Sequence, residues 1–172
     1  LDSTATLAAP PGAAAATFTA VGQTSMTLSW SAGLNPAGTL YLARASTSSN
    51  LDGSADLLSG LLTGFTTGFV GLLPDTTYFF RVAARGHSGQ YSALHDPGAK
   101  ATLAYEPAAS TEPIHAVWVT SATVQWQAGG NPATTLYQAE ASTAADFTGT
   151  VRASGWAAAL STTVTGLVGD ST

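Results

Sequence analysis

Three histidines, an acidic loop and a glycine-rich turn are the places in this 172-residue sequence that invite a search for chemistry. His87, His95 and His115 do not show the i, i+2 or i, i+4 spacing with which one face of a strand or helix presents two metal ligands. Cysteine is absent, so the chain has no thiolate ligand, no disulfide and no cysteine nucleophile. We therefore expect no metal site and no bound cofactor.

The acidic loop and the glycine-rich turn are also interpreted as structural. Asp52-Gly53-Ser54-Ala55-Asp56 lacks the alternating oxygen ligands and the closing glutamate of a calcium-binding loop, which favours a solvated turn. Gly86-His87-Ser88-Gly89 is one residue shorter than the Gly-x-Ser-x-Gly of a nucleophile elbow, and it lies in a predicted hairpin. No pair of carboxylates recurs as an acid/base couple. The sequence predicts a protein without enzymatic activity.

Charge and hydropathy exclude two kinds of partner. Charged residues make up 9% of the chain, and ten acids against five basic residues give a net charge of −5 without a basic cluster, so we expect no nucleic acid. The leucine-rich stretch 57–73 is interrupted by glycines, and no apolar run approaches the roughly 20 residues that a membrane-spanning helix needs. We expect no membrane span.

The elements that would position any site are duplicated. Trp30 and Trp126 lie 96 residues apart (126 − 30), and nearly the same sequence follows each of them. Trp30-Ser-Ala-Gly-Leu-Asn-Pro-Ala recurs as Trp126-Gln-Ala-Gly-Gly-Asn-Pro-Ala. A period this long indicates a tandem array of small domains rather than a short-repeat solenoid.

Each copy reads as a series of short strands. Apolar and polar residues alternate with a period of two, which is typical of half-buried strands, and no helix-length stretch with a period of 3.6 is present. The alternating segments are 25–30, 41–45, 65–69 and 78–84 in the first copy, and 122–126, 137–141 and 160–164 in the second. This pattern predicts an all-β chain that folds as antiparallel β-sandwiches.

One segment resembles the signature of a known family. Leu72-x-Pro74-x-Thr76-x-Tyr78-x-Phe80-x-Val82-x-Ala84 is similar to the pattern of a fibronectin type III module, and Trp30 and Tyr41-x-Ala43 occupy the matching earlier strands. The resemblance covers Pro10 to Ala104 completely and Tyr105 to Thr172 in part. It implies tandem immunoglobulin-like β-sandwiches, and the Asn-Pro-Ala turn is most similar to bacterial extracellular copies.

The resemblance also implies a set of core positions and domain limits. In the family, a leucine packs into the core below a loop, and a tyrosine hydroxyl forms a hydrogen bond with the backbone of that loop. The implied core and tyrosine-corner residues are Trp30, Tyr41, Leu72, Tyr78, Trp126, Tyr137 and Leu167. We expect residues 1–9 to be the end of a preceding module and its linker, 10–104 a complete module, and 105–172 a second module that lacks its last two strands. Further chain, or a strand from a neighbouring subunit, is expected to complete it.

Several positions are more apolar than an exposed strand edge requires, and they are candidates for an interface. The alternatives are core packing or, for Trp156, stacking on a sugar ring. The candidates are Leu57, Leu58, Leu61, Leu62, Trp118 and Trp156. Residues 101–113 read as a short, proline-bearing linker, which is stiffer than a Gly/Ser tether and would favour modules stacked end to end.

These features favour a non-catalytic structural or adhesive repeat segment of a large secreted or cell-surface protein, extracellular and of bacterial type. Its expected partners are neighbouring modules or copies of itself, through strand donation or filament contacts. The first alternative is a spacer or accessory module of an extracellular polysaccharide-degrading enzyme. The second is a receptor in which the loop 85–90 recognises a protein ligand, although His87 stands where an integrin-binding loop would carry aspartate.

Overall fold

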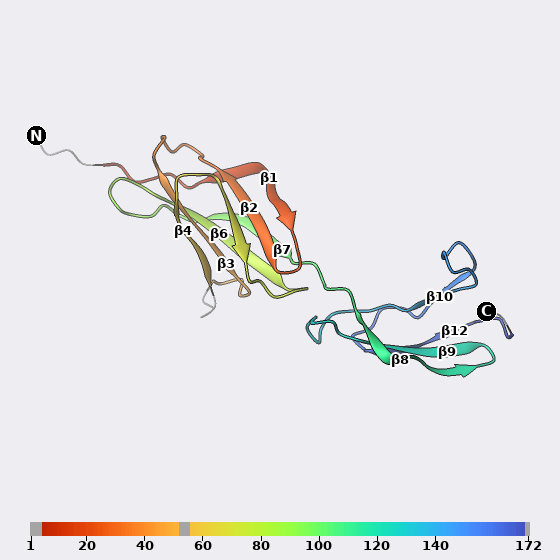
Figure 1. The fold of residues 1–172 in the computed structure, drawn as a ribbon. Coiled ribbons are helices and arrows are strands. Elements are labelled where there is room, and N and C mark those ends of the chain that lie inside the picture. Colours follow the sequence, from red (N-terminus) through yellow and green to blue (C-terminus); the bar gives the residue numbers. More distant parts are fainter. Residues whose placement is uncertain (1–4, 52–55, 171–172) are drawn as a thin grey trace, which may run out of the picture. The chain divides into compact units, whose positions relative to one another are not determined.

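The chain forms two compact units, Leu1–Leu103 (unit 1) and Ala104–Thr172 (unit 2), which are described one at a time. The structure is a computed structural model that describes residues 5–51 and 56–170. Residues 52–55 of the acidic loop, 1–4 of the N-terminal segment and 171–172 therefore lie outside the described residues. Within those ranges the chain has twelve β-strands and no helix (Figure 1). No helix long and apolar enough to cross a membrane is found in this described part.

Unit 1 is a sandwich of two antiparallel sheets. One sheet has the order β1-β2-β5 and the other β4-β3-β6-β7 (Figure 1). The strands are β1 (Gly12–Val21), β2 (Ser25–Ser31), β3 (Leu40–Ser46), β4 (Leu57–Leu62), β5 (Thr66–Val70), β6 (Thr77–Arg85) and β7 (His95–Ala101). Both sheets contribute to one core, so the predicted all-β sandwich is confirmed.

The core of unit 1 follows from the alternation of its strands. On β2, Met26, Leu28 and Trp30 are buried while the polar residues between them are not, as a period of two requires. β6 is buried at Tyr78, Phe80, Val82 and Ala84, as the sequence predicts, and also at Ala83. Central strand β6 lies between β3 and β7, so its apolar side chains face the other sheet and fill the middle of the core.

Unit 2 repeats part of this framework. Its sheets have the orders β8-β9-β12 and β10-β11. The strands are β8 (Ala108–Trp118), β9 (Ser121–Gln127), β10 (Glu140–Ser142), β11 (Val151–Ala153) and β12 (Ser161–Thr165). They correspond to β1, β2, β3, β4 and β5 of unit 1. Residues 104–170 contain no counterpart of β6 or β7.

The segment between the two units is shorter than the sequence suggests. β8 begins at Ala108, so the second half of the predicted linker 101–113 is a strand. Pro113 lies within β8, which is an edge strand, and the register shifts between Ala109 and Ile114. Proline is tolerated at such a place because an edge strand with a local shift does not need every N–H for the ladder.

A serine-centred bulge interrupts an edge strand in each unit. In β4 the register against β3 shifts between Leu42 and Arg44, and Ser59 Oγ accepts the Ala43 amide at 3.0 Å. Gly60 follows with φ of 72°. In unit 2, Ser154 Oγ accepts the Ala139 amide at 3.1 Å, and Gly155 has φ of 80°. Such bulges bend an edge strand and discourage further strand pairing there.

Candidate functional site: linker clamps and an open sheet face

The residues considered for chemistry lie on separate elements. His95 lies on β7, His115 on β8, and His87 in the turn after β6. His115 Nδ1 is 3.7 Å from Glu112 Oε2, and both side chains are exposed. In residues 5–51 and 56–170, no group of three or more histidine or acidic side chains is placed to hold a metal ion. The Gly86 turn closes with a 2.9 Å bond from the Gly89 amide to the Gly86 carbonyl, as a hairpin loop does.

Asn35 of the Asn-Pro turn binds the segment that enters unit 1. Its Oδ1 accepts a hydrogen bond from the Ala9 amide, and its Nδ2 donates to the Ala9 carbonyl, both at 2.8 Å. A third bond, from Nδ2 to the Ala32 carbonyl at 2.8 Å, fixes the plane of the side-chain amide. Because a carboxamide offers both an acceptor and two donors, it satisfies both backbone groups of Ala9 at once.

Asn131 makes the same three bonds in unit 2. Its Oδ1 accepts the Tyr105 amide at 2.6 Å, and Nδ2 donates to the Tyr105 carbonyl at 2.8 Å and to the Ala128 carbonyl at 2.9 Å. Its side chain is buried. We call the two arrangements, Asn35 with Ala9 and Asn131 with Tyr105, the linker clamps.

A glycine makes room for each linker clamp. Gly33 has φ of 63°, and a Cβ there would lie 2.7 Å from the Pro10 carbonyl oxygen. Gly129 has φ of 66°, and a Cβ would meet the Glu106 carbonyl oxygen even more closely. Only glycine combines a positive φ with so close a backbone approach. The sequence predicts the Asn-Pro turn but not the clamp, although Gly33 and Asn35 recur at the same spacing as Gly129 and Asn131.

Unit 1 contains the tyrosine corner that the resemblance implies. Tyr78 Oη accepts a hydrogen bond from the Leu73 amide at 2.9 Å, and Leu72 beside it is buried. Thr102 Oγ1 donates to the Leu73 carbonyl at 2.7 Å and accepts the Thr76 amide at 3.0 Å. The turn 72–78 is therefore held from two sides. In unit 2, the described residues after Leu167 include no tyrosine.

The other predicted core residues lie inside, to different depths. Trp30 and Tyr41 are buried with ring centroids 6.1 Å apart. Trp126 and Tyr137 repeat this contact at 5.8 Å, but Trp126 is half-buried, as is Leu167. Burial raises the pKa of the Tyr41 hydroxyl, which has no hydrogen-bond partner within the described residues.

The candidate interface residues divide into two groups. Leu57 and Leu62 are half-buried and pack against the core of unit 1, whereas Leu58 and Leu61 are exposed. The bulge at Ser59 causes this division, because one extra residue reverses the face that later side chains take. Trp118 and Trp156 are exposed by 57% and 68%. Within the described part of the chain, neither indole ring packs against another aromatic ring.

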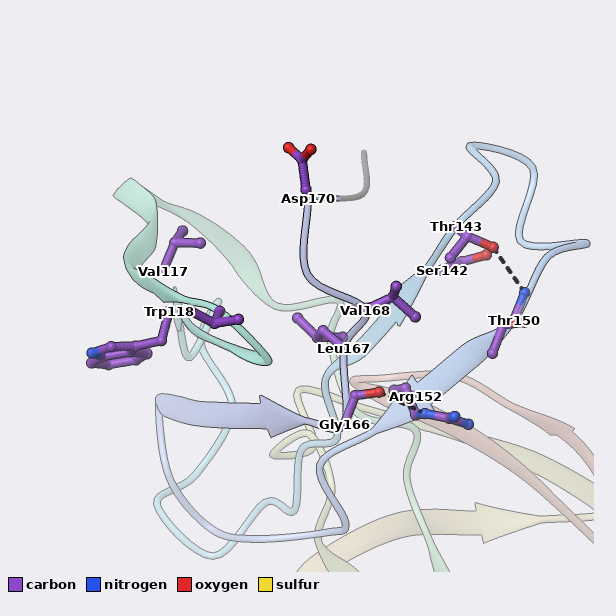
Figure 2. A pocket seen from close by; sticks show the side chains of 12 residues that line it. Val117, Trp118, Ser142, Thr143, Thr150, Arg152, Gly166, Leu167, Val168 and Asp170 are labelled. Carbon is purple, nitrogen blue, oxygen red and sulfur yellow. Dashed lines mark hydrogen bonds between the residues drawn. The ribbon is translucent and has the colours of Figure 1, made fainter.

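An open groove lies in unit 2 between residues of β8, β10 and β11 and the segment 166–170. It has a volume of about 330 Å³. Leu167 and Val168 lie between the residues of β8 on one side and those of β10 and β11 on the other (Figure 2). The Thr150 amide donates to Thr143 Oγ1 at 3.0 Å across the β10–β11 rim, and Arg152 Nε donates to the Gly166 carbonyl at 3.0 Å. The lining is mostly apolar: Val117, Trp118, Val119, Ala141, Leu167 and Val168 are part of it.

Known structures share this architecture. A segment of two fibronectin type III domains from chicken tenascin aligns with 94% of this chain and 85% of its own length, with a TM-score of 0.55 and 14% identity. A fourth fibronectin type III domain from a human protein aligns over 64% of this chain and 91% of its own, with a TM-score of 0.50 and 16% identity. No protein-family model matches the chain, and no curated protein matches it. The chain thus has the fold of tandem fibronectin type III modules.

Proposed function

We propose that this chain is a non-catalytic structural or adhesive repeat segment of a large secreted or cell-surface protein. The observation that carries the proposal is the linker clamp, which recurs with the same three hydrogen bonds in both units. Both clamps act on the backbone of the segment that enters the module. A chain built in this way fixes how each module is entered, which suits extension and display.

Secretion and a bacterial source belong to the same proposal. The low charge content and the absence of cysteine are compatible with an extracellular module that does without disulfides. The Asn-Pro-Ala turn, which forms both clamps, is the part of the sequence most similar to bacterial extracellular modules. The parent reading frame tests the wider role: a long run of further copies supports a structural array, and an adjoining hydrolase domain contradicts it.

The clamp itself can be tested by hydrogen exchange of the amide that it binds. Because the Tyr105 amide donates to Asn131 Oδ1, we expect its exchange to accelerate several-fold in Asn131→Ala. Asn35→Ala is the matched control, because it releases the Ala9 amide and leaves the clamp on Tyr105 intact. Unchanged exchange of the Tyr105 amide in Asn131→Ala would contradict the proposed role.

A further inference from the structure

The two sheets of each unit differ in charge. In unit 1, strands β1, β2 and β5 contain no charged residue. The charged and histidine side chains on strands of this unit all belong to the other sheet, and they are Arg44, Arg81, Arg85, His95, Asp96 and Lys100. In unit 2, β9 and β12 are likewise uncharged, whereas Glu140 and Arg152 lie on β10 and β11. Strand β8 departs from this division, since it contains Glu112 and His115.

The outer face of the uncharged sheet of unit 1 presents mainly hydroxyl groups. Met26, Leu28 and Phe69 are buried, so the residues that alternate with them on β2 and β5 point away from the core. Ser29 Oγ donates a hydrogen bond to Thr66 Oγ1 across the two strands at 3.2 Å. The outward positions are Ser25, Thr27, Ser29, Ser31, Thr66, Gly68 and Val70.

The same face recurs in unit 2. Val164 of β12 is buried opposite Ala122 of β9, so the residues on either side of this pair point outward. Thr123 lies opposite Thr163, and their hydroxyl oxygens are 2.7 Å apart. The outward positions are Ser121, Thr123, Gln125, Gln127, Ser161, Thr163 and Thr165. We call the outward positions of the two units their hydroxyl faces.

The exposure of a hydroxyl face is a property of its own sheet. In unit 1 the second sheet has four strands, and it packs against the inner side of the first sheet to enclose one core. Ser25, Thr66, Gly68 and Val70 nevertheless remain exposed, because they lie on the side away from that core. The outer face therefore does not depend on how the second sheet of a unit is built.

Unit 2 adds an aromatic ring to its hydroxyl face. Trp118 of β8 lies opposite Ser121 of β9, and Thr165 of β12 lies opposite the same serine from the other side. Residues directly opposite one another share a face of the sheet, so the indole lies on the outer side. Figure 2 shows the indole pointing away from Leu167 and Val168. An indole offers a flat apolar surface with a polar N–H at its edge, which suits stacking on a sugar ring.

The chemistry of these faces favours a partner that is itself uncharged and covered with hydroxyl groups. Removing water from a charged side chain is costly unless the charge is paired, and the hydroxyl faces contain no charge to pair. Serine and threonine hydroxyls donate and accept, and they rotate to suit the groups opposite. Interfaces between proteins are instead depleted in serine and alanine and enriched in aromatic residues, methionine and arginine. A neutral polysaccharide therefore fits better than a protein.

The area of one face points the same way. Three strands about 4.8 Å apart, each contributing about five residues at ~3.3 Å, cover roughly 14 by 17 Å, or about 240 Å². A stable interface between two proteins buries about 800 Å² on each partner. One hydroxyl face is therefore too small to hold a second copy of the chain. On the extended surface of a polymer, weak contacts from two linked modules reinforce one another.

We propose that the hydroxyl faces bind the surface of an uncharged, insoluble polysaccharide. The hydroxyl groups of the two faces exchange hydrogen bonds with those of the polymer, and Trp118 stacks on a sugar ring beside the face of unit 2. This proposal rests on the proposed function, because it gives the adhesive role a class of ligand. The two can fail separately: loss of polysaccharide binding would leave the linker clamps and their exchange test unaffected.

The test uses the full 172-residue chain, with microcrystalline cellulose and crystalline chitin as the probes. In a depletion assay we expect saturable binding to at least one of them. Because the hydroxyl faces are uncharged, the affinity should change less than about twofold between roughly 0.05 and 0.5 M salt. Binding to neither polymer would overturn the proposal. A strong loss of binding in salt would assign the contact to the charged sheets and would also overturn it.

Variants that place a charge on a hydroxyl face separate recognition from folding. A Cβ at Gly68 has open space and φ there is not positive, so Gly68→Glu should fold normally. Thr163→Glu is its counterpart at an exposed position of unit 2. Each should weaken binding several-fold, and the double variant about tenfold, because the new carboxylates must be dehydrated on contact. Ala99→Glu, at an exposed position of β7, adds the same charge to the other sheet and is the matched control.

The outcomes of these variants decide the proposal. We expect Ala99→Glu to bind as the unchanged chain does, and Trp118→Ala to lose affinity several-fold with unit 2 still folded by amide exchange. Equal affinity in the double variant and in Ala99→Glu would overturn the proposal. A dimer in sedimentation that the double variant dissociates would assign the hydroxyl faces to a second copy of the chain, and would overturn it too.

Discussion

Units 1 and 2 repeat the same backbone turns, yet the side chains around those turns are buried to different extents. Leu51 and Phe147 have positive φ at matching positions, as do Asp75 and Asp170. The two linker clamps have the same bonds. In contrast, Trp30 is buried and its counterpart Trp126 is half-buried. Local sequence therefore specifies the turns and clamps, whereas in unit 1 the buried Phe80 of β6 also packs the core against Phe18 and Phe69.

The largest expected effect on stability comes from removing the aromatic ring of Phe80 from the core of unit 1. Phe80→Ala should lower the free energy of unfolding of unit 1 by about 3–5 kcal/mol, because it leaves a cavity between Phe18 and Phe69. Ile114→Ala in unit 2 should cost less than about 1 kcal/mol, because an exposed side chain loses little burial. Urea unfolding with amide exchange assigned to each unit measures both. Equal losses would mean that the core of unit 2 is closed.

The clamp glycines should respond alike in the two units. Gly33→Ala and Gly129→Ala each place a Cβ against a carbonyl oxygen at positive φ, so each should cost roughly 2 kcal/mol or more. Gly38→Ala also changes a positive-φ glycine, but it has open space around the new Cβ and should cost about 1 kcal/mol. Thermal and urea unfolding of the three variants checks the order. A much smaller loss for Gly129→Ala would show that the turn of unit 2 depends on core closure.

Removing the tyrosine corner of unit 1 should cause a smaller loss of stability. The described residues of unit 2 include no equivalent tyrosine. Tyr78→Phe removes the bond to the Leu73 amide and should cost about 1 kcal/mol. Tyr91→Phe, at an exposed ring, is the control and should change stability by less than about 0.5 kcal/mol. Exchange of the Leu73 amide should accelerate in Tyr78→Phe alone. Unchanged exchange of the Leu73 amide in Tyr78→Phe would show that the Tyr78 hydroxyl does not stabilise this turn.

The smallest effect is a pH dependence of unit 1. The Ser46 hydroxyl and the Arg44 guanidinium hold the pKa of the Asp56 carboxyl below its usual value of about 4. A lowered pKa in the folded state means that the stabilisation is present above the unfolded pKa and is lost as the pH falls through the folded pKa. Unit 1 should therefore lose stability below about pH 4. Asp56→Asn should flatten this dependence in urea titrations between pH 6 and 2; an identical slope would exclude Asp56 as its source.

Much of the fold could be predicted because apolar and polar residues alternate along individual strands. Strands β2, β3, β5 and β6 of unit 1 follow from a period of two, and the fold class is confirmed; the segments that form β1, β4 and β7 do not show that alternation. The division of Leu57 and Leu62 from Leu58 and Leu61 could not be predicted, because the bulge at Ser59 reverses the parity of the strand. Asn35 is predictable only as part of a turn, because its partner Ala9 lies 26 residues away and sequence spacing does not indicate such a bond.

The linker clamps also determine how a tensile load would enter each module. A pull on the chain at Tyr105 reaches Asn131 before it reaches the first ladder bond of β8 at Ala108. The two bonds to one residue resist such a pull together, because both must lengthen before the backbone can peel away. Under a stretching force, the linker clamp of each module would therefore break first. The β-sandwich that follows it would stay folded until those two hydrogen bonds are lost.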